Sequence, residues 1–443
     1  MRDPAARLVM EVDRVVRQLR EPLPAPHFLN SALARAWRDR GDLVDFTIVD
    51  DHTVTARRIP FVSLPVEWCD LQLFQAAEFT LRLQREAVEA GYDLKDASAW
   101  NVLFDAGRPV FCDLLSFEPL TRKRWWAAGQ FARHFLLPLL LSTRRGLPAY
   151  KAFQAWRDGV PHDVARRMMG ASRFLTRYWP LMAQGGGTPA AVEAQAGGVD
   201  DLDAIHRFRA GLNPSLAWML RGVDPRRPLP SPSPWRDYVS ERGHYGDADL
   251  VVKRERVAGW VRALAPVWAL DLGCNSGEFS RLVADSSAQT NVIGVDLDAG
   301  AISRAVAQGG ERLNFLVAPL DDLRGGYGWS GQEHAGLMQR LRGHADLTLM
   351  LALVHHLMIG ASIPLPEVAA FATAMTRRWL VVELIAREDV QIVLMQSQRD
   401  RSDTLPSVDE QLRLFQAAGL AVRERVPLPI GTRELVLFER MQP

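Results

Sequence analysis

The sequence predicts an α/β protein in which a doubly wound, mostly parallel seven-stranded sheet follows an α+β, helix-rich domain. Three observations support this fold class. The 443 residues exceed what one ordinary hydrophobic core accommodates. A proline-rich segment at 224–235 favours extended backbone and predicts a linker between domains 1–223 and 236–443. After the linker, short apolar runs alternate with helical patterns, as in parallel sheets with crossover helices.

The composition argues against several classes of protein. Lysine and arginine number 53 and aspartate and glutamate 52, so no charge excess indicates a nucleic-acid partner. Cys69, Cys112 and Cys274 stand far apart without metal-ligand spacing, which favours a reducing, cytoplasmic location. The most apolar run, 135–141, is much shorter than the roughly 20 residues of a membrane-spanning helix. We therefore expect a buried helix there and no membrane insertion.

The N-terminal domain is expected to hold both strands and helices. Apolar residues between positions 8 and 19 predict an amphipathic helix near the start of the chain. The elements expected after it are strands within 53–63, a helix over 71–90, a hairpin of 102–104 with 110–113, and mostly helix over 125–223. These patterns describe an α+β region followed by helices.

The C-terminal domain shows a regular alternation of strands and helices. The expected strands are 268–272, 291–297, 314–317, 347–353 and 379–384, closed by a pair at 419–424 and 435–440, with a helix over 277–285 after the first strand. Continuous apolar runs of this length are typical of strands that are buried on both faces. The order predicts a Rossmann-like sheet whose ligands bind at the carboxyl ends of the strands.

The strongest motif is residues 269–280, Ala-Leu-Asp-Leu-Gly-Cys-Asn-Ser-Gly-Glu-Phe-Ser, a strand that enters a glycine turn and then a helix. It resembles the first motif of the class I S-adenosylmethionine (SAM) dependent methyltransferases. The resemblance implies that Asp271 meets the ammonium group of the cofactor, directly or through water. It also implies that the methionine part lies against the turn formed by Gly273, Cys274, Asn275 and Gly277.

A nicotinamide-binding fold is the alternative for this motif. That fold requires G-x-G-x-x-G so that a helix N-terminus faces a pyrophosphate, whereas here the glycines are spaced differently and Glu278 follows them. Asp296 ends the second predicted strand, where a carboxylate accepts hydrogen bonds from ribose hydroxyls, and Asp298 is a second candidate. The remaining expected cofactor contacts are Leu297, Ala318, Leu320 and Leu351.

Two adjacent histidines follow the fourth predicted strand, where the reacting sulfonium would lie. His355 or His356 is a candidate general base that takes a proton from an acceptor hydroxyl or amine. The alternative is that one histidine packs in the core and the other caps the following turn. The sequence has no Asn-Pro-Pro-Tyr-type segment here, which disfavours base or amide N-methylation of that style.

The chain also resembles a bacterial group of methyltransferases that includes nodulation-associated proteins of rhizobia. The matching segments are 65–68, 94–101, 108–117, 271–280, 351–357 and 381–383. They fall in both domains, and the resemblance implies methyltransferase activity without fixing an acceptor. The chain departs from the group at 401–406, where Arg-Ser-Asp-Thr-Leu-Pro replaces a Tyr-Thr pair and aromatic residues.

The N-terminal domain contains a second spacing of interest. Asp96, Asn101 and Asp113 are spaced like the catalytic aspartate, magnesium-binding asparagine and magnesium-binding aspartate of kinase-like phosphotransferases. A glycine-rich phosphate loop is missing, and Arg57 and Arg58 are poor substitutes for a phosphate-binding lysine. The alternatives are a degenerate kinase-like domain, an active one, or three polar residues that only cap turns and strands.

The sequence thus favours a SAM-dependent methyltransferase that transfers a methyl group to oxygen or nitrogen of an unidentified acceptor. That acceptor can be a small molecule, a saccharide, a lipid-linked compound or a protein. Two other hypotheses stay open: a SAM-binding sensor or scaffold, and a bifunctional protein whose kinase-like domain binds nucleotide. Lys253, with Tyr238 and Tyr245, belongs to a segment expected to form a lid over the cofactor.

Overall fold

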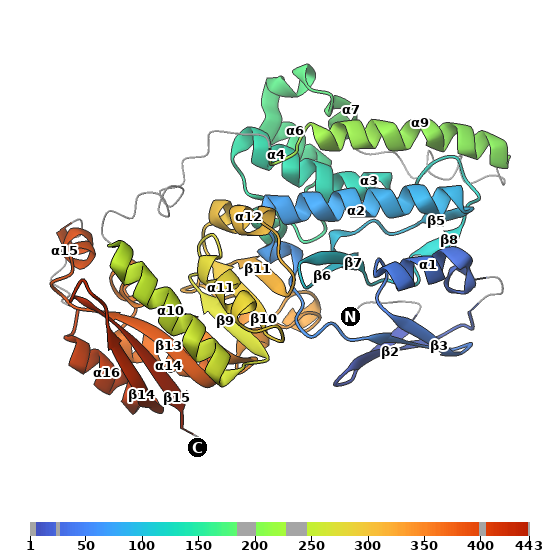
Figure 1. The fold of residues 1–443 in the computed structure, drawn as a ribbon. Helices are drawn as coiled ribbons and strands as arrows, with labels where there is room; N and C mark the ends of the chain where they lie inside the picture. The colour runs from blue at the N-terminus through green and yellow to red at the C-terminus, as the bar shows by residue number, and fades with distance from the viewer. Residues whose placement is uncertain (1–5, 24–26, 184–200, 227–245, 398–404, 442–443) are drawn as a thin grey trace. The chain divides into compact units, whose positions relative to one another are not determined.

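The computed structural model describes residues 6–23, 27–183, 201–226, 246–397 and 405–441. The chain divides into two compact units, Met1–Ser231 and Pro232–Pro443, which are called unit 1 and unit 2 below. Figure 1 shows the helices and strands of each. Most of the predicted linker, the glycine-rich stretch at 185–198, Tyr238, Tyr245 and most of 401–406 lie outside the described residues.

Unit 1 begins with a four-stranded antiparallel sheet in the order β1-β2-β4-β3. Its strands are β1 (Ala6–Met10), β2 (Arg14–Leu19), β3 (Phe46–Asp50) and β4 (Thr53–Arg57). The predicted helix over residues 8–19 is therefore wrong. The backbone N–H of Glu11 donates to the carbonyl of Arg14 at 2.9 Å and closes a turn there. The β-branched Val15 and Val16 favour the pleated, half-buried surface of a strand.

The predicted strand segment 53–63 is only partly correct. β4 ends at Arg57, and Pro60, which has no backbone N–H to donate to a ladder, lies just beyond it. The predicted hairpin is confirmed as β6 (Val102–Asp105) antiparallel to β7 (Arg108–Phe111). A second short pair joins β5 (Tyr92–Leu94) to β8 (Phe117–Pro119).

The described residues of unit 1 also include the following helices. They are α1 (Ala32–Arg40), α2 (Asp70–Glu89), α3 (Ala128–Phe131), the π-helix η4 (Ala132–Leu136), α4 (Leu137–Arg145), α5 (Ala149–Ala155), α6 (His162–Met169), α7 (Trp179–Ala183) and α9 (Leu202–Arg221), with the 3-10 helix η3 (Ala99–Asn101) before β6. The predicted helix at 71–90 is confirmed by α2, against which α9 packs. The apolar run 135–141 is fully buried, as expected. Among the described residues, none of the helices has the length and apolar character needed to cross a membrane.

Unit 2 is built on a seven-stranded sheet in the order β11-β10-β9-β12-β13-β15-β14. The strands are β9 (Trp268–Leu272), β10 (Asn291–Asp296), β11 (Leu313–Val317), β12 (Ala345–Met350), β13 (Thr376–Ile385), β14 (Leu420–Pro427) and β15 (Arg433–Arg440). β15 pairs antiparallel with both neighbours, and the other pairings are parallel. This arrangement confirms the predicted seven-stranded, mostly parallel sheet.

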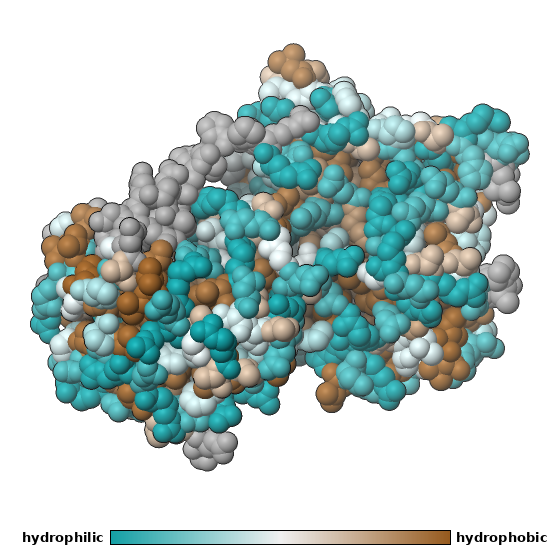
Figure 2. Space-filling view, viewed as in Figure 1, coloured by the Kyte–Doolittle hydropathy of each residue, from teal (hydrophilic) through white to brown (hydrophobic). Residues whose placement is uncertain are grey.

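Helices cover the sheet of unit 2. They are α10 (Asp247–Leu264), α11 (Glu278–Ser286), α12 (Ala299–Ala307), α13 (Leu337–Leu341), the π-helix η7 (His356–Gly360), α14 (Leu365–Met375), α15 (Val390–Ser397) and α16 (Val408–Ala417). α11 and α12 pack on the strands β9 to β11, whereas α14 and α16 pack on the other half of the sheet. Figure 2 shows mostly hydrophilic residues on the visible face and apolar ones at α15, where Val390, Val393 and Leu394 are exposed.

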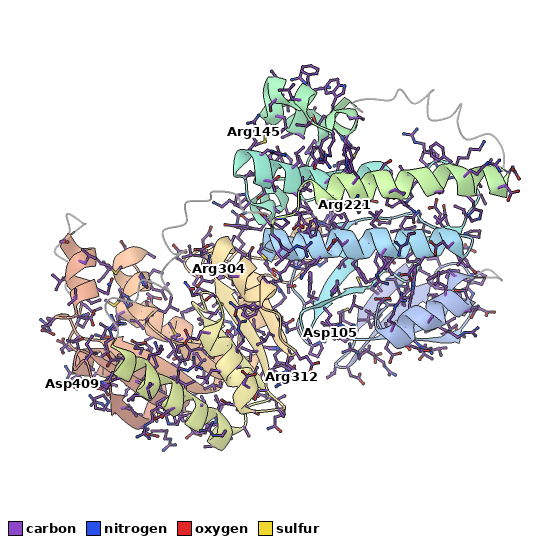
Figure 3. All side chains as sticks on the ribbon, turned by 45° about the horizontal axis from the view of Figure 1, so that its top comes forward. Asp105, Arg145, Arg221, Arg304, Arg312 and Asp409 are labelled. Carbon is purple, nitrogen blue, oxygen red and sulfur yellow. The ribbon has the colours of Figure 1, made fainter. Side chains whose placement is uncertain are left out.

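The two edges of the parallel sheet have different roles. At the amino-terminal edge, Arg312, labelled in Figure 3, precedes β11 and donates to the backbone carbonyls of Ala284, Ser287 and Thr290. Those hydrogen bonds join the end of α11 to the start of β11. The loops at the carboxyl-terminal edge contain the residues that the sequence selects as cofactor and catalytic candidates.

Candidate functional site

The turn after β9 has an unusual backbone. Gly273, Asn275 and Gly277 have φ of 75°, 48° and 77°, in the left-handed region that disfavours side chains with a Cβ. The backbone N–H groups of Gly273 and Cys274 both donate to the carbonyl of Val295, at 2.8 and 3.1 Å. The turn is therefore fixed against the end of β10.

Gly277 is also required by packing within the protein. A Cβ at Gly277 would lie 2.7 Å from the ring of Phe315 on β11, and one at Gly294 on β10 would meet the same ring at 2.7 Å. A Cβ at Gly273 would lie 3.1 Å from Leu353. From the sequence, Gly273 and Gly277 are expected because the cofactor lies against them. The positive φ and these contacts are two further reasons for glycine.

Asp296 ends β10 and faces the glycine turn. One carboxylate oxygen accepts from the backbone N–H of Asn275 at 2.8 Å, and the other accepts from the N–H of Asp298 at 2.8 Å. Burial raises the pKa of Asp296, although these backbone hydrogen bonds oppose the shift. Asp298 instead caps α12, since its carboxylate accepts from Gly300 and Ala301. Of the two candidates, Asp296 is the one tied to the turn.

Asp271 lies at the carboxyl end of β9 and is 2% exposed. Its carboxylate accepts a hydrogen bond of 2.6 Å from the Ser280 hydroxyl on α11. Burial raises the pKa of Asp271 to about 6, and the negative charge of Asp296 adds to the rise while Lys253 opposes it. A buried carboxylate with a raised pKa is a site that a cationic group would stabilise.

The other predicted cofactor contacts follow the strands of the same sheet and differ in their burial. Ala318 follows β11, is 5% exposed, and donates from its N–H to the carbonyl of Asp296 at 2.9 Å. Leu320 is partly buried, Leu351 is buried just after β12, and Leu297 is 58% exposed. Burial raises the pKa of the Cys274 thiol well above its usual value, so this cysteine stays protonated and is a poor nucleophile.

The two candidate histidines lie in the segment after β12, where the π-helix η7 begins. Ala352 has φ of 51°, and the chain then enters the π-helix η7, a form found often at functional sites. The predicted strand 347–353 therefore ends early, at Met350. The rings of His355 and His356 lie 4.2 Å apart, and His355 is 3% exposed. Burial, with a contribution from the Arg433 charge, lowers the pKa of His356 to about 4, so its imidazole is neutral near pH 7.

A buried network of charges, which the sequence did not predict, lies near this edge of the sheet. Lys253 of α10 contacts Glu383 of β13, whose second oxygen lies 3.3 Å from Arg433 of β15. Arg433 also binds Asp389 through two hydrogen bonds of 2.8 and 3.0 Å. The available signal was Glu383 inside the apolar run Leu-Val-Val-Glu-Leu-Ile, since a charge in a buried strand requires a partner.

In unit 1 the structure brings Asp96, Asn101 and Asp113 together. The side-chain amide of Asn101 donates to the backbone carbonyl of Asp96 at 3.2 Å, and the N–H of Cys112 donates to the carbonyl of Asn101 at 2.9 Å. The candidate lysine substitute Arg57 lies elsewhere, in an ion pair with Asp105. Among the described residues, no group of three His, Cys, Asp or Glu side chains could hold a metal ion.

If the seven strands of unit 2 are numbered along the chain, their order across the sheet is 3-2-1-4-5-7-6, and only the seventh is antiparallel to the others. The glycine turn follows the first strand. Unit 2 has the class I methyltransferase fold. No family model matches the sequence. The chain is 28% identical over 477 aligned positions to nodulation protein NoeA of Rhizobium meliloti (strain 1021), an alignment that covers 100% of this chain and 95% of NoeA.

Solved methyltransferase structures resemble about half of the chain. Magnesium protoporphyrin IX methyltransferase (ChlM) from Synechocystis PCC 6803, with bound SAH, is 15% identical at a TM-score of 0.32 and covers 46% of this chain and 97% of its own. N-methyltransferase NodS from Bradyrhizobium japonicum WM9 is 12% identical at a TM-score of 0.32 and covers 44% of this chain and 98% of its own.

Proposed function

We propose that the domain at 236–443 is a SAM-dependent methyltransferase that transfers a methyl group to oxygen or nitrogen of an acceptor. The domain at 1–223 contributes to the choice of acceptor or partner, and 224–235 links the two. A reducing compartment such as the cytoplasm suits the protein, which the free thiols of Cys69, Cys112 and Cys274 support.

The observation that carries this proposal is the meeting of Asp271, the glycine turn and Asp296 at the carboxyl edge of the sheet. Ligands of open α/β sheets bind at that edge. The backbone hydrogen bond from Asn275 to Asp296 fixes the turn relative to the carboxylate. Two carboxylates within electrostatic reach of each other suit a ligand with a cationic end and a neutral polyhydroxyl end.

The residues of unit 2 fit the cofactor in charge and position. The negative charge of Asp271 would attract the ammonium group of the cofactor, and Asp296 would accept hydrogen bonds from its ribose hydroxyls. Ala318 and Leu320 would border the adenine. The cofactor supplies a methyl group on a sulfonium, which is already a strong electrophile, so the protein contributes chiefly by holding the acceptor in line with it.

A base role for His356 is part of the proposal. Its pKa of about 4 keeps the imidazole neutral and able to accept a proton from an acceptor hydroxyl or amine as the carbon–oxygen or carbon–nitrogen bond forms. His355 is the neighbouring candidate, with its ring centroid 4.2 Å away. Separate substitution of the two histidines distinguishes them.

The decisive experiment follows radiolabelled methyl from SAM into extracts of a host that lacks the gene. Fractions of small molecules, lipid and polysaccharide, nucleic acid and protein are counted after incubation with the wild-type protein or Asp296→Ala. Label in one fraction, absent with the variant, supports the enzyme and names its acceptor class. Tight SAM binding with no labelled fraction would contradict the proposal and favour a SAM sensor.

A further inference from the structure

The cluster of Asp96, Asn101 and Asp113 in unit 1 has the spacing of a metal-dependent phosphotransferase site. Burial raises the pKa of Asp96, and the nearby negative charge of Asp113 adds to the rise. The side-chain amide of Gln130 donates to Asp96 at 2.7 Å and orients its carboxylate. The fold therefore assembles two carboxylates and an amide, whose negative charge requires a cation nearby.

A cation from elsewhere in the chain already lies at the cluster. Arg17 of β2, 96 residues before Asp113, places Nη1 2.7 Å from Oδ1 of that aspartate. Their side chains are 11% and 27% exposed, so water screens the pair only weakly. Burial alone would raise the pKa of Asp113, but the charge of Arg17 and the hydrogen bond from Ser116 lower it below its usual value.

The coordination needs of a divalent metal conflict with this arrangement. Magnesium requires near-octahedral oxygen ligands at close range. Both oxygens of Asp113 already accept protein donors: Oδ1 accepts from Arg17 and from the backbone N–H of Leu115, and Oδ2 accepts from the Ser116 hydroxyl. A guanidinium within hydrogen-bond distance would also repel a second cation. The residues present do not fit a bound metal at Asp113.

We infer that Arg17 takes the place of the divalent cation at this cluster, so that unit 1 holds its two carboxylates without a metal. The guanidinium neutralises Asp113, and Asp96 remains the hydrogen-bond acceptor held by Gln130. While Arg17 stays in place, unit 1 cannot bind the metal that phosphoryl transfer of this kind requires. This inference is independent of the proposed methyl transfer in unit 2.

Manganese binding to the full-length protein tests the inference. Free Mn²⁺ is followed by its electron paramagnetic resonance signal during titration of the wild type, Arg17→Met and Arg17→Gln. We expect no detectable site in the wild type and one site in each variant, with a Kd at least about tenfold below the weakest Kd that the titration detects, because a carboxylate oxygen is released to a hard cation. Adding Asp113→Asn to Arg17→Met should abolish the gain.

Arg57→Met is the matched control. Arg57 belongs to the same sheet as Arg17 and pairs with Asp105 at the end of β6. Asp105 is labelled in Figure 3. Arg57→Met should leave Mn²⁺ binding unchanged. The inference fails if the wild type binds Mn²⁺ and loses it in Asp113→Asn, a result that requires no Arg17 variant to fold. It also fails if folded Arg17→Met and Arg17→Gln gain no site.

Discussion

The ammonium group of Lys253 on α10 bonds the carboxylate of Glu383 on β13, 130 residues later in the chain. The two side chains are 6% and 0% exposed, and Lys253 also lies over the ring of Phe279 on α11, 4.9 Å from its centroid. The charge of Lys253 further acts on Asp271 at the end of β9. A single buried lysine thus connects the helix before the sheet with the candidate cofactor edge.

Lys253→Met should lower the free energy of unfolding of unit 2 by about 3–5 kcal/mol. Arg433 would then be shared by the two buried carboxylates Glu383 and Asp389, which leaves the network with a net negative charge. Arg254→Met is the control on the same helix, because Arg254 pairs with Glu278 at the surface with 46% of its side chain exposed. That control should cost about 0–1 kcal/mol. Urea denaturation followed by tryptophan fluorescence measures both. Equal losses would contradict the role given to Lys253.

SAM affinity should depend on the pH with a midpoint near the pKa of Asp271, about 6. The raised pKa means that the carboxyl group is neutral below this pH, when it no longer attracts an ammonium group. Affinity should therefore be constant above pH 7 and fall up to about tenfold per unit below pH 6. Calorimetric titration from pH 5 to 8 measures it. Asp271→Asn should bind weakly at all these pH values, and an unchanged pH profile in that variant would reject the assignment.

His356→Ala should retain SAM binding and lower turnover by about 10²–10⁴-fold if this histidine is the general base. Because its pKa is lowered to about 4, the imidazole stays neutral at higher pH. Turnover of the wild type should therefore be flat from pH 6 upward and fall only toward pH 4. A rate that halves near pH 6.5 would indicate an ordinary imidazole instead. His344→Gln, just before β12 at the opposite edge, is the control and should retain turnover.

Gly294→Ala should destabilise the protein by about 1–3 kcal/mol through overpacking. Its Cβ would lie 2.7 Å from the Phe315 ring and 2.9 Å from the Cys274 sulfur. Gly259→Ala, within α10 and with no atom inside 4 Å of the new Cβ, should instead stabilise by up to about 1 kcal/mol. Opposite signs in thermal unfolding support the packing account, whereas the same sign in both variants would refute it.

The parallel strands of unit 2 could be predicted because most of them are short apolar runs bounded by turn residues and separated by helical patterns, as in a sheet covered on both faces. The fourth strand was predicted too long at its carboxyl end, since Leu351 and Leu353 are apolar although Ala352 leaves the strand with a positive φ. The N-terminal helix was wrong because two short strands joined by a tight turn can also place apolar residues at helical spacing.

The candidate site was predictable to the extent that its residues lie close together in the sequence. Asp271 and the glycine turn fall within a few positions, and Asp296 follows at the end of the next strand. Lys253, Glu383 and Arg433 meet only through the fold, so no local spacing reveals them. The same applies to Arg17 and Asp113 in unit 1. Because residues 8–19 were predicted as a helix and not as two strands, Arg17 was not expected near Asp113.

The position of β15 between β13 and β14 affects how unit 2 is assembled during synthesis. β15 comes later in the chain than both strands it joins. During synthesis on the ribosome, β14 therefore has no neighbour in the sheet until β15 emerges. Until then Glu383 also lacks its ion pair with Arg433. A nascent chain stalled before residue 433 should expose the edge of β13, which makes that intermediate a natural target for chaperones.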